Sequence, residues 1–137
     1  MIYDYVADKL KAVPQIGENV FPVGVNIDDI YTTDLDFSFT VYTFVRRTPE
    51  VDLEGDIHHY TEEVLVDFIG HLYGNIHSMY EAVEKAFRVS DLDTGTGEYI
   101  YSVRCSSPQP DAFDPELGLL RRTLQLTIQW VPLPEEV

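Results

Sequence analysis

The four histidines are the side chains best suited to metal binding or proton transfer: His58, His59, His71 and His77. Their spacing matches neither HExxH nor a Cys/His zinc motif. His58 and His59 begin an expected strand, where neighbouring side chains point to opposite faces, so the pair is poorly placed to share one metal ion. A site that combines one of them with Glu62 or Asp67 is the alternative. Solvated or hydrogen-bonded histidines are the simpler interpretation.

An acidic segment at Asp91–Glu98 faintly resembles a calcium-binding loop. An EF-hand requires glycine at its sixth position and glutamate at its twelfth, but here those positions hold Thr96 and Ser102. We therefore interpret Gly95-Thr-Gly97 as a hairpin turn or a helix-exit turn.

The familiar motifs of nucleotide binding and nucleophilic catalysis do not occur. The sequence has no GxxxxGK[ST], GxGxxG or GxSxG. The single cysteine, Cys105, has no base beside it and lies in an alternating apolar stretch, which is typical of a buried, inert thiol. Carboxylate pairs such as Glu62 and Glu63 are too common among 24 acidic residues to single one out. The sequence therefore predicts no catalytic residue, no metal and no cofactor, and favours a protein that is not an enzyme.

The charge of the chain narrows the choice of partners. The formal net charge is −15, from 24 acidic and 9 basic residues among 137. A surface this negative repels nucleic acid and anionic lipid, so we expect no sequence-specific nucleic-acid binding and no membrane partner. The acidity either serves solubility or forms a like-charged wall past which DNA slides. Because no signal-peptide pattern and no membrane-length apolar stretch occurs, we expect a cytoplasmic protein.

The few basic residues include two doublets, and each flanks a strand end: Arg46, Arg47, Arg121 and Arg122. One interpretation is that they are solvated and offset local acidity. The other is that they contact an acidic patch on another copy of the chain, as a ring of subunits with acidic surfaces requires. These four arginines are the candidate subunit contacts.

Apolar spacing predicts one domain, 1–137, of the α+β class. Residues Ile2, Val6 and Leu10 recur at helical spacing, and a second helical pattern follows the third strand. The expected helices are 2–13 and 70–88, and the expected strands are 20–26, 36–46, 57–69, 98–105 and 119–131. Sequential strands usually pair as antiparallel neighbours. We therefore expect a mainly antiparallel sheet of four or five strands with the two helices packed on it.

Three connections are too long for simple turns: Asp28–Asp36, Thr48–Asp56 and Ser106–Pro115. Loops of about this length are often functional. We expect the last two, together with the four arginines, to form the contact surface.

Five segments carry a resemblance that spans nearly the whole chain: the helix Ile2–Val13, Val20-Phe-Pro22, the aromatic strand Phe37–Val45, the strand and helix Val64–Phe87, and the strand Arg121–Trp130. With these segments in this order, the chain resembles the small tail-completion and tail-terminator proteins of long-tailed bacteriophages and prophages.

The resemblance implies a structural protein of the virion tail, assembled in the bacterial host cytoplasm. It implies a ring-like homo-oligomer, commonly a hexamer, that closes the head-proximal end of the tail and contacts other tail or connector proteins. It implies no enzyme and no cofactor. The alternatives are a small cytoplasmic ligand- or protein-binding module, or a hydrolase that uses carboxylates or a metal. A binding module would show an apolar pocket with a few converging polar groups.

Overall fold

The computed structural model describes residues 2–24 and 37–134. The predicted loop at 28–36 and the end of the predicted strand at 20–26 lie outside the described residues. None of the described helices has the length and apolar character needed to cross a membrane.

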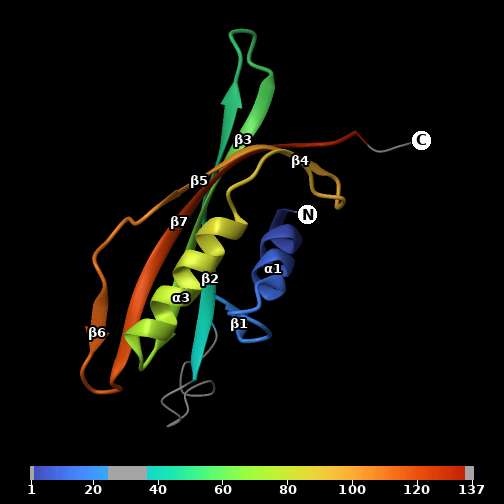
Figure 1. Cartoon of the computed structure of the whole chain (residues 1–137). Helices are drawn as coiled ribbons and strands as arrows, with labels where there is room; N and C mark the ends of the chain where they lie inside the picture. Colours follow the sequence, from blue (N-terminus) through green and yellow to red (C-terminus); the bar gives the residue numbers. More distant parts are fainter. Residues whose placement is uncertain (1, 25–36, 135–137) are drawn as a thin grey trace.

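Two helices lie side by side over one face of a single sheet (Figure 1). The first, α1 (Ile2–Ala12), has Ile2, Val6 and Leu10 buried toward the sheet and ends just before Pro14. The second, α3 (Tyr73–Ala86), follows the third strand after two residues. Both helices are amphipathic, and their apolar sides cover the middle of the sheet.

Within the described residues the sheet has seven strands: β1 (Val20–Pro22), β2 (Ser38–Val51), β3 (Ile57–Gly70), β4 (Ser90–Asp93), β5 (Glu98–Ser106), β6 (Ala112–Asp114) and β7 (Leu119–Pro132). Their order across the sheet is β1-β2-β3-β7-β5-β4, and β6 pairs with the start of β7. Every pair is antiparallel except β1 with β2, which is parallel. The long central strands β3 and β7 supply most of the core residues that come from the sheet.

The prediction of four or five mainly antiparallel strands is therefore wrong. The described sheet is mixed and has seven strands. The sequence assigned β4 to a turn and β6 to a loop, since strands of four and three residues are too short to show alternation. They form because β5 and β7 offer neighbouring edges with which they pair.

The main core lies between the helices and the alternate positions of β3 and β7 that face them. Val64, Val66 and Phe68 of β3 are fully buried there, opposite Leu126 and Leu124 of β7. A second, smaller cluster lies on the other face of the sheet at the end near Gly70. It contains three buried residues: Phe39, Ile69 and Leu119. We call the sheet face opposite the helices the open face.

Gly70 ends β3 where two strands come very close. A Cβ atom at this position would lie 2.8 Å from the Cβ of Ser38. Glycine thus permits the tight pairing that ends the strand, and the chain turns into α3 soon afterwards. The helix predicted from residue 70 accordingly begins three residues later.

Replacing Tyr5 by phenylalanine is expected to raise the free energy of unfolding by about 1 kcal/mol. The hydroxyl of Tyr5 is buried and finds no hydrogen-bond partner among the described residues, so its removal loses no bond. Burial raises the pKa of Tyr5 above its usual 10.0. The unfolded chain therefore ionises first, and the advantage of Y5F should widen as the pH rises past that value. Urea denaturation measures both effects. The exposed Tyr3→Phe variant is the control, and a clear loss of stability in Y5F would contradict the packing described.

Candidate assembly surfaces

The four candidate arginines do not form one patch. Arg46 and Arg47 are paired with Glu63 and Glu62 of β3, whereas Arg121 lies opposite Ile69. Since Glu63 and Ile69 are six residues apart on one strand, the doublets are separated by about 20 Å. Within each doublet, one arginine faces the helices and the other lies on the open face. The structure therefore does not bring the two arginine doublets together into a single contact surface.

Arg47 lies at the surface, with a third of its side chain exposed, and pairs with a buried carboxylate. Its Nε donates a hydrogen bond to Oε1 of Glu62 at 2.8 Å, and the Glu62 side chain is only 2% exposed. The indole Nε1 of Trp130 donates to the same oxygen at 3.3 Å. Partial burial alone would lower the pKa of Arg47, but the hydrogen bond and charge of Glu62 raise it above its ordinary value. Arg47 is therefore a fixed cation that neutralises a buried carboxylate.

Three aromatic rings from three elements surround the Arg47 guanidinium. Its central carbon lies 4.9 Å from the ring centre of Trp130 in β7, 5.4 Å from Tyr3 in α1 and 5.8 Å from Tyr60 in β3. Tyr60 and Trp130 also stack on each other, with centroids 5.1 Å apart. Such cation–π contacts favour a guanidinium strongly when it is partly desolvated. They tie the N-terminal helix to the base of the β2–β3 hairpin.

Arg122 is also engaged within the chain. Its guanidinium lies 4.1 Å from the ring centre of Tyr80, and its Nη1 donates a hydrogen bond to Nδ1 of His77 at 2.8 Å. Asp111 lies 3.7 Å from its Nε. Because Nδ1 of His77 accepts this bond, its Nε2 is free to donate to Glu81 at 3.1 Å. Whether any of the four arginines also contacts another subunit stays a prediction.

The histidine pair at the start of β3 differs from the expectation. The Nδ1 atoms of His58 and His59 lie 3.1 Å apart, so the two rings converge. The cause is a bulge: the pairing of β2 and β3 shifts between Glu50 and Val51, which leaves His58 unpaired. Even so, no three His, Cys, Asp or Glu side chains of the described residues cluster in a way that could hold a metal ion.

Cys105 and the acidic turn have structural contacts. Cys105 is half-buried against the main core, and burial raises the pKa of its thiol.

In the turn after β4, the backbone N–H of Thr94 donates to the carbonyl of Glu98, and the Thr96 hydroxyl donates to a carboxylate oxygen of Glu98. The turn therefore uses its polar groups to close a hairpin.

The open face of the sheet presents polar side chains that no described helix covers (Figure 1). Its carboxylates are engaged within the face: Glu63 lies 3.6 Å from Arg46, and Asp67 accepts a hydrogen bond from Thr123 at 2.5 Å. Gln109 donates in turn to the Thr123 hydroxyl. The carboxylates of Glu63 and Asp67 on this face are therefore paired within the sheet.

The β2–β3 hairpin projects beyond the rest of the sheet as a two-stranded arm (Figure 1). The pairing of β3 with β7 begins only at Tyr60, so residues 49–59, here called the arm, have no further strand beside them among the described residues. Pro49 fits here because an unpaired edge needs no N–H donor. The sequence assigned Thr48–Asp56 to a loop, but β2 continues to Val51.

The end of the arm, residues 51–57, is an ordered turn with exposed aliphatic side chains; we call it the tip. A carboxylate oxygen of Asp52 accepts hydrogen bonds from the backbone N–H groups of Glu54 and Asp56. Leu53 is fully exposed at 107% of its reference area, and Val51 and Ile57 are more than half exposed. An exposed aliphatic patch held by a rigid turn is typical of an interaction site. The sequence feature that could have indicated this site is the presence of three aliphatic residues within an acidic segment.

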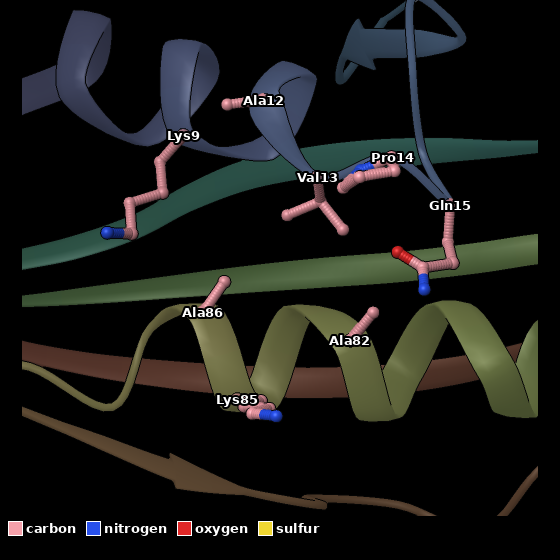
Figure 2. A pocket seen from close by; sticks show the side chains of 8 residues that line it. All are labelled: Lys9, Ala12, Val13, Pro14, Gln15, Ala82, Lys85 and Ala86. Carbon is pink, nitrogen blue, oxygen red and sulfur yellow. The ribbon is translucent and has the colours of Figure 1, made fainter.

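A groove of about 550 Å³ separates the two helices (Figure 2). Its lining combines small apolar residues with two lysines: Lys9, Ala12, Val13, Pro14, Gln15, Ala82, Lys85 and Ala86. Figure 2 shows Ala82 and Ala86 of α3 directed toward α1, and Lys9 of α1 extending toward α3. The groove could not be predicted from the sequence, because the residues that line it belong to helices about 70 residues apart in the chain.

Comparison with known proteins gives a match to solved structures. No protein-family model matches the chain, and no curated protein matches it. Among solved structures, a chain described as "Virion of native gene transfer agent (GTA) particle" is similar over 92% of its own length and 92% of this chain, with a TM-score of 0.66. This chain and that one share a fold. The two sequences are 13% identical, so the likeness concerns the fold as a whole.

Proposed function

We propose that this chain is a structural protein of a virion, and specifically a tail-completion protein of the tail-terminator kind. In this proposal it acts without catalysis, by self-association into a ring at the head-proximal end of the tail. Its partners are further copies of itself and the neighbouring tail or connector proteins. It would be assembled in the cytoplasm of the bacterial host.

The observation that carries the proposal is the full-length match of fold to a virion chain, which covers 92% of both chains. The sequence resemblance to tail-completion proteins points in the same direction and spans the same elements. The projecting arm adds a physical argument, because an ordered tip with three exposed aliphatic side chains is costly to leave in water unless it meets a partner.

Self-association can be tested by native mass spectrometry and light scattering across a series of salt and protein concentrations. A charge of −15 on each subunit opposes assembly at low ionic strength, so we expect monomers in dilute, low-salt solution. Screening shortens the range of repulsion to about 8 Å at physiological ionic strength, and closed oligomers of one stoichiometry should then appear at high protein concentration. A continuous ladder of sizes without a preferred stoichiometry would contradict a ring.

A small ligand- or protein-binding module is the second candidate, and the groove between α1 and α3 favours it. Its volume lies within the range of about 300–1,000 Å³ that small-molecule sites occupy. This candidate predicts that a set of small anionic or apolar compounds raises the melting temperature of the chain. It also predicts that substitutions in the groove abolish the effect while leaving the oligomeric state unchanged.

A further inference from the structure

We propose that the tip of one copy of this chain docks into the groove between α1 and α3 of a neighbouring copy. The inference rests on the proposed self-association and names its contact: Leu53 enters the groove, and the carboxylates around it meet Lys9 and Lys85. It replaces the arginine doublets as the principal subunit contact.

Charge complementarity indicates that the acidic tip is the segment that binds in the groove. The tip carries Asp52, Glu54 and Asp56, and the chain as a whole has only three lysines. Two of those three line the groove, and none of the described residues that line it is acidic. In a chain with a net charge of −15, this groove is an unusual place where an acidic segment of another copy is attracted rather than repelled.

The acidic side chains of α3 beside the groove pair with residues other than Lys85. Glu81 pairs with His77, and Glu84 pairs with Arg88. No ion pair involves Lys85 in the part of the chain that the structure describes. On α1, the ammonium group of Lys9 lies over the face of the Tyr5 ring, 5.8 Å from its centre, and forms no ion pair with another described residue. Both ammonium groups can therefore bind carboxylates from outside.

The apolar parts of the two surfaces also match. Leu53 stands fully exposed at the apex of the tip, and the groove offers the methyl groups of Ala12, Ala82 and Ala86. The hydrogen bonds from the backbone to Asp52 hold the turn in one shape, so docking orders little additional chain. A rigid aliphatic anchor that fills a groove with charges at its rim is the usual arrangement of an interface centre.

The positions of the two surfaces determine the kind of assembly. The tip projects from one end of the sheet, away from the two helices (Figure 1), so a chain does not insert its tip into its own groove. The contact joins different surfaces of two copies, which makes it a head-to-tail contact. Repeated contacts of this kind close into a ring when the rotation between copies permits it.

Disulfide trapping tests the contact even if the assembly is weak. In a Cys105→Ala background, Leu53→Cys and Ala82→Cys are combined in one chain and oxidised at high protein concentration. We expect covalent multimers that end in a single closed species. Each single-cysteine variant alone should yield only monomer and traces of dimer, and a mixture of the two should yield a one-to-one heterodimer. Failure of the double-cysteine chain to cross-link beyond the single-cysteine variants would overturn the proposal.

Charge reversal provides an independent test with matched controls. Glu54→Lys in the tip and Lys85→Glu in the groove should each weaken self-association about tenfold or more. Mixing the two variants should restore assembly as oligomers in which the variants alternate one to one, because each tip then meets a groove of opposite charge. The controls are Glu116→Lys, in a distant exposed turn, and Lys11→Glu, on α1 outside the groove; both should assemble normally. Rings that persist in both E54K and K85E would refute this contact while leaving the proposed function intact. If the wild-type chain neither forms oligomers at high protein concentration nor binds tails, the proposed function fails as well.

Discussion

Replacement of Arg47 by methionine is expected to lower the free energy of unfolding by about 3 kcal/mol. Methionine keeps much of the aliphatic contact of Arg47 but removes its charge, which leaves the carboxylate of Glu62 buried with one hydrogen bond, from Trp130. Removing one partner of a buried pair typically costs about 3–5 kcal/mol. The lower end applies because a third of the Arg47 side chain still reaches water. Urea denaturation followed by tryptophan fluorescence measures the loss, and Trp130 is the only tryptophan.

Two further variants identify the cause of this loss. The double variant Arg47→Met with Glu62→Gln should recover part of the stability, because it no longer buries an unpaired charge and keeps a carbonyl acceptor for Trp130. Arg46→Met is the matched control: its pair with Glu63 is longer, at 3.6 Å, and its side chain is 68% exposed, so about 1 kcal/mol or less should be lost. Equal losses for R46M and R47M would contradict the difference between the neighbouring arginines.

Replacement of Phe39 by alanine is expected to cost about 3–5 kcal/mol, although Phe39 lies on the sheet face that no described helix covers. Its side chain is 1% exposed and packs with Ile69 and Leu119, and the rings of Phe21 and Phe37 lie within 6.4 Å of it. Alanine would leave a cavity that this small cluster cannot refill.

The control for Phe39 is Val45→Ala, in the same strand. Val45 is about half exposed and should lose about 1 kcal/mol or less. A loss below about 1 kcal/mol for F39A, measured by the same urea denaturation, would mean that the second cluster is not a real core.

The helices and long strands could be predicted because each contains its own pattern. Apolar residues recur at helical spacing along α1 and α3, and they alternate along β3 and β7. The short strands β4 and β6 and the parallel pairing of β1 could not be predicted, since they depend on neighbouring edges that are distant in sequence. The convergence of His58 and His59 depends on a bulge, which a regular alternation conceals.

The surfaces were harder to predict than the elements, for a related reason. The sequence indicated Arg47 as a candidate subunit contact, which stays a prediction. Its partners within the chain, Tyr3, Glu62 and Trp130, could not be predicted because they come from three elements that meet only in the fold. The groove between α1 and α3 likewise exists only after both helices lie on the sheet. Only the tip had a local signal, in the aliphatic side chain of Leu53 within an acidic segment.

A tail-completion protein should bind to the ends of purified tails. Purified tails from particles assembled without this chain would be incubated with gold-labelled protein and examined by negative-stain electron microscopy, with labelled serum albumin as an acidic control. We expect label at one end of each tail, the end that joins the head, and ring-shaped density at that end. Binding should occur even where the free chain is monomeric, because the tail tube can template the ring. Label that is absent from tail ends, or spread evenly along the tube, would contradict a tail-completion role.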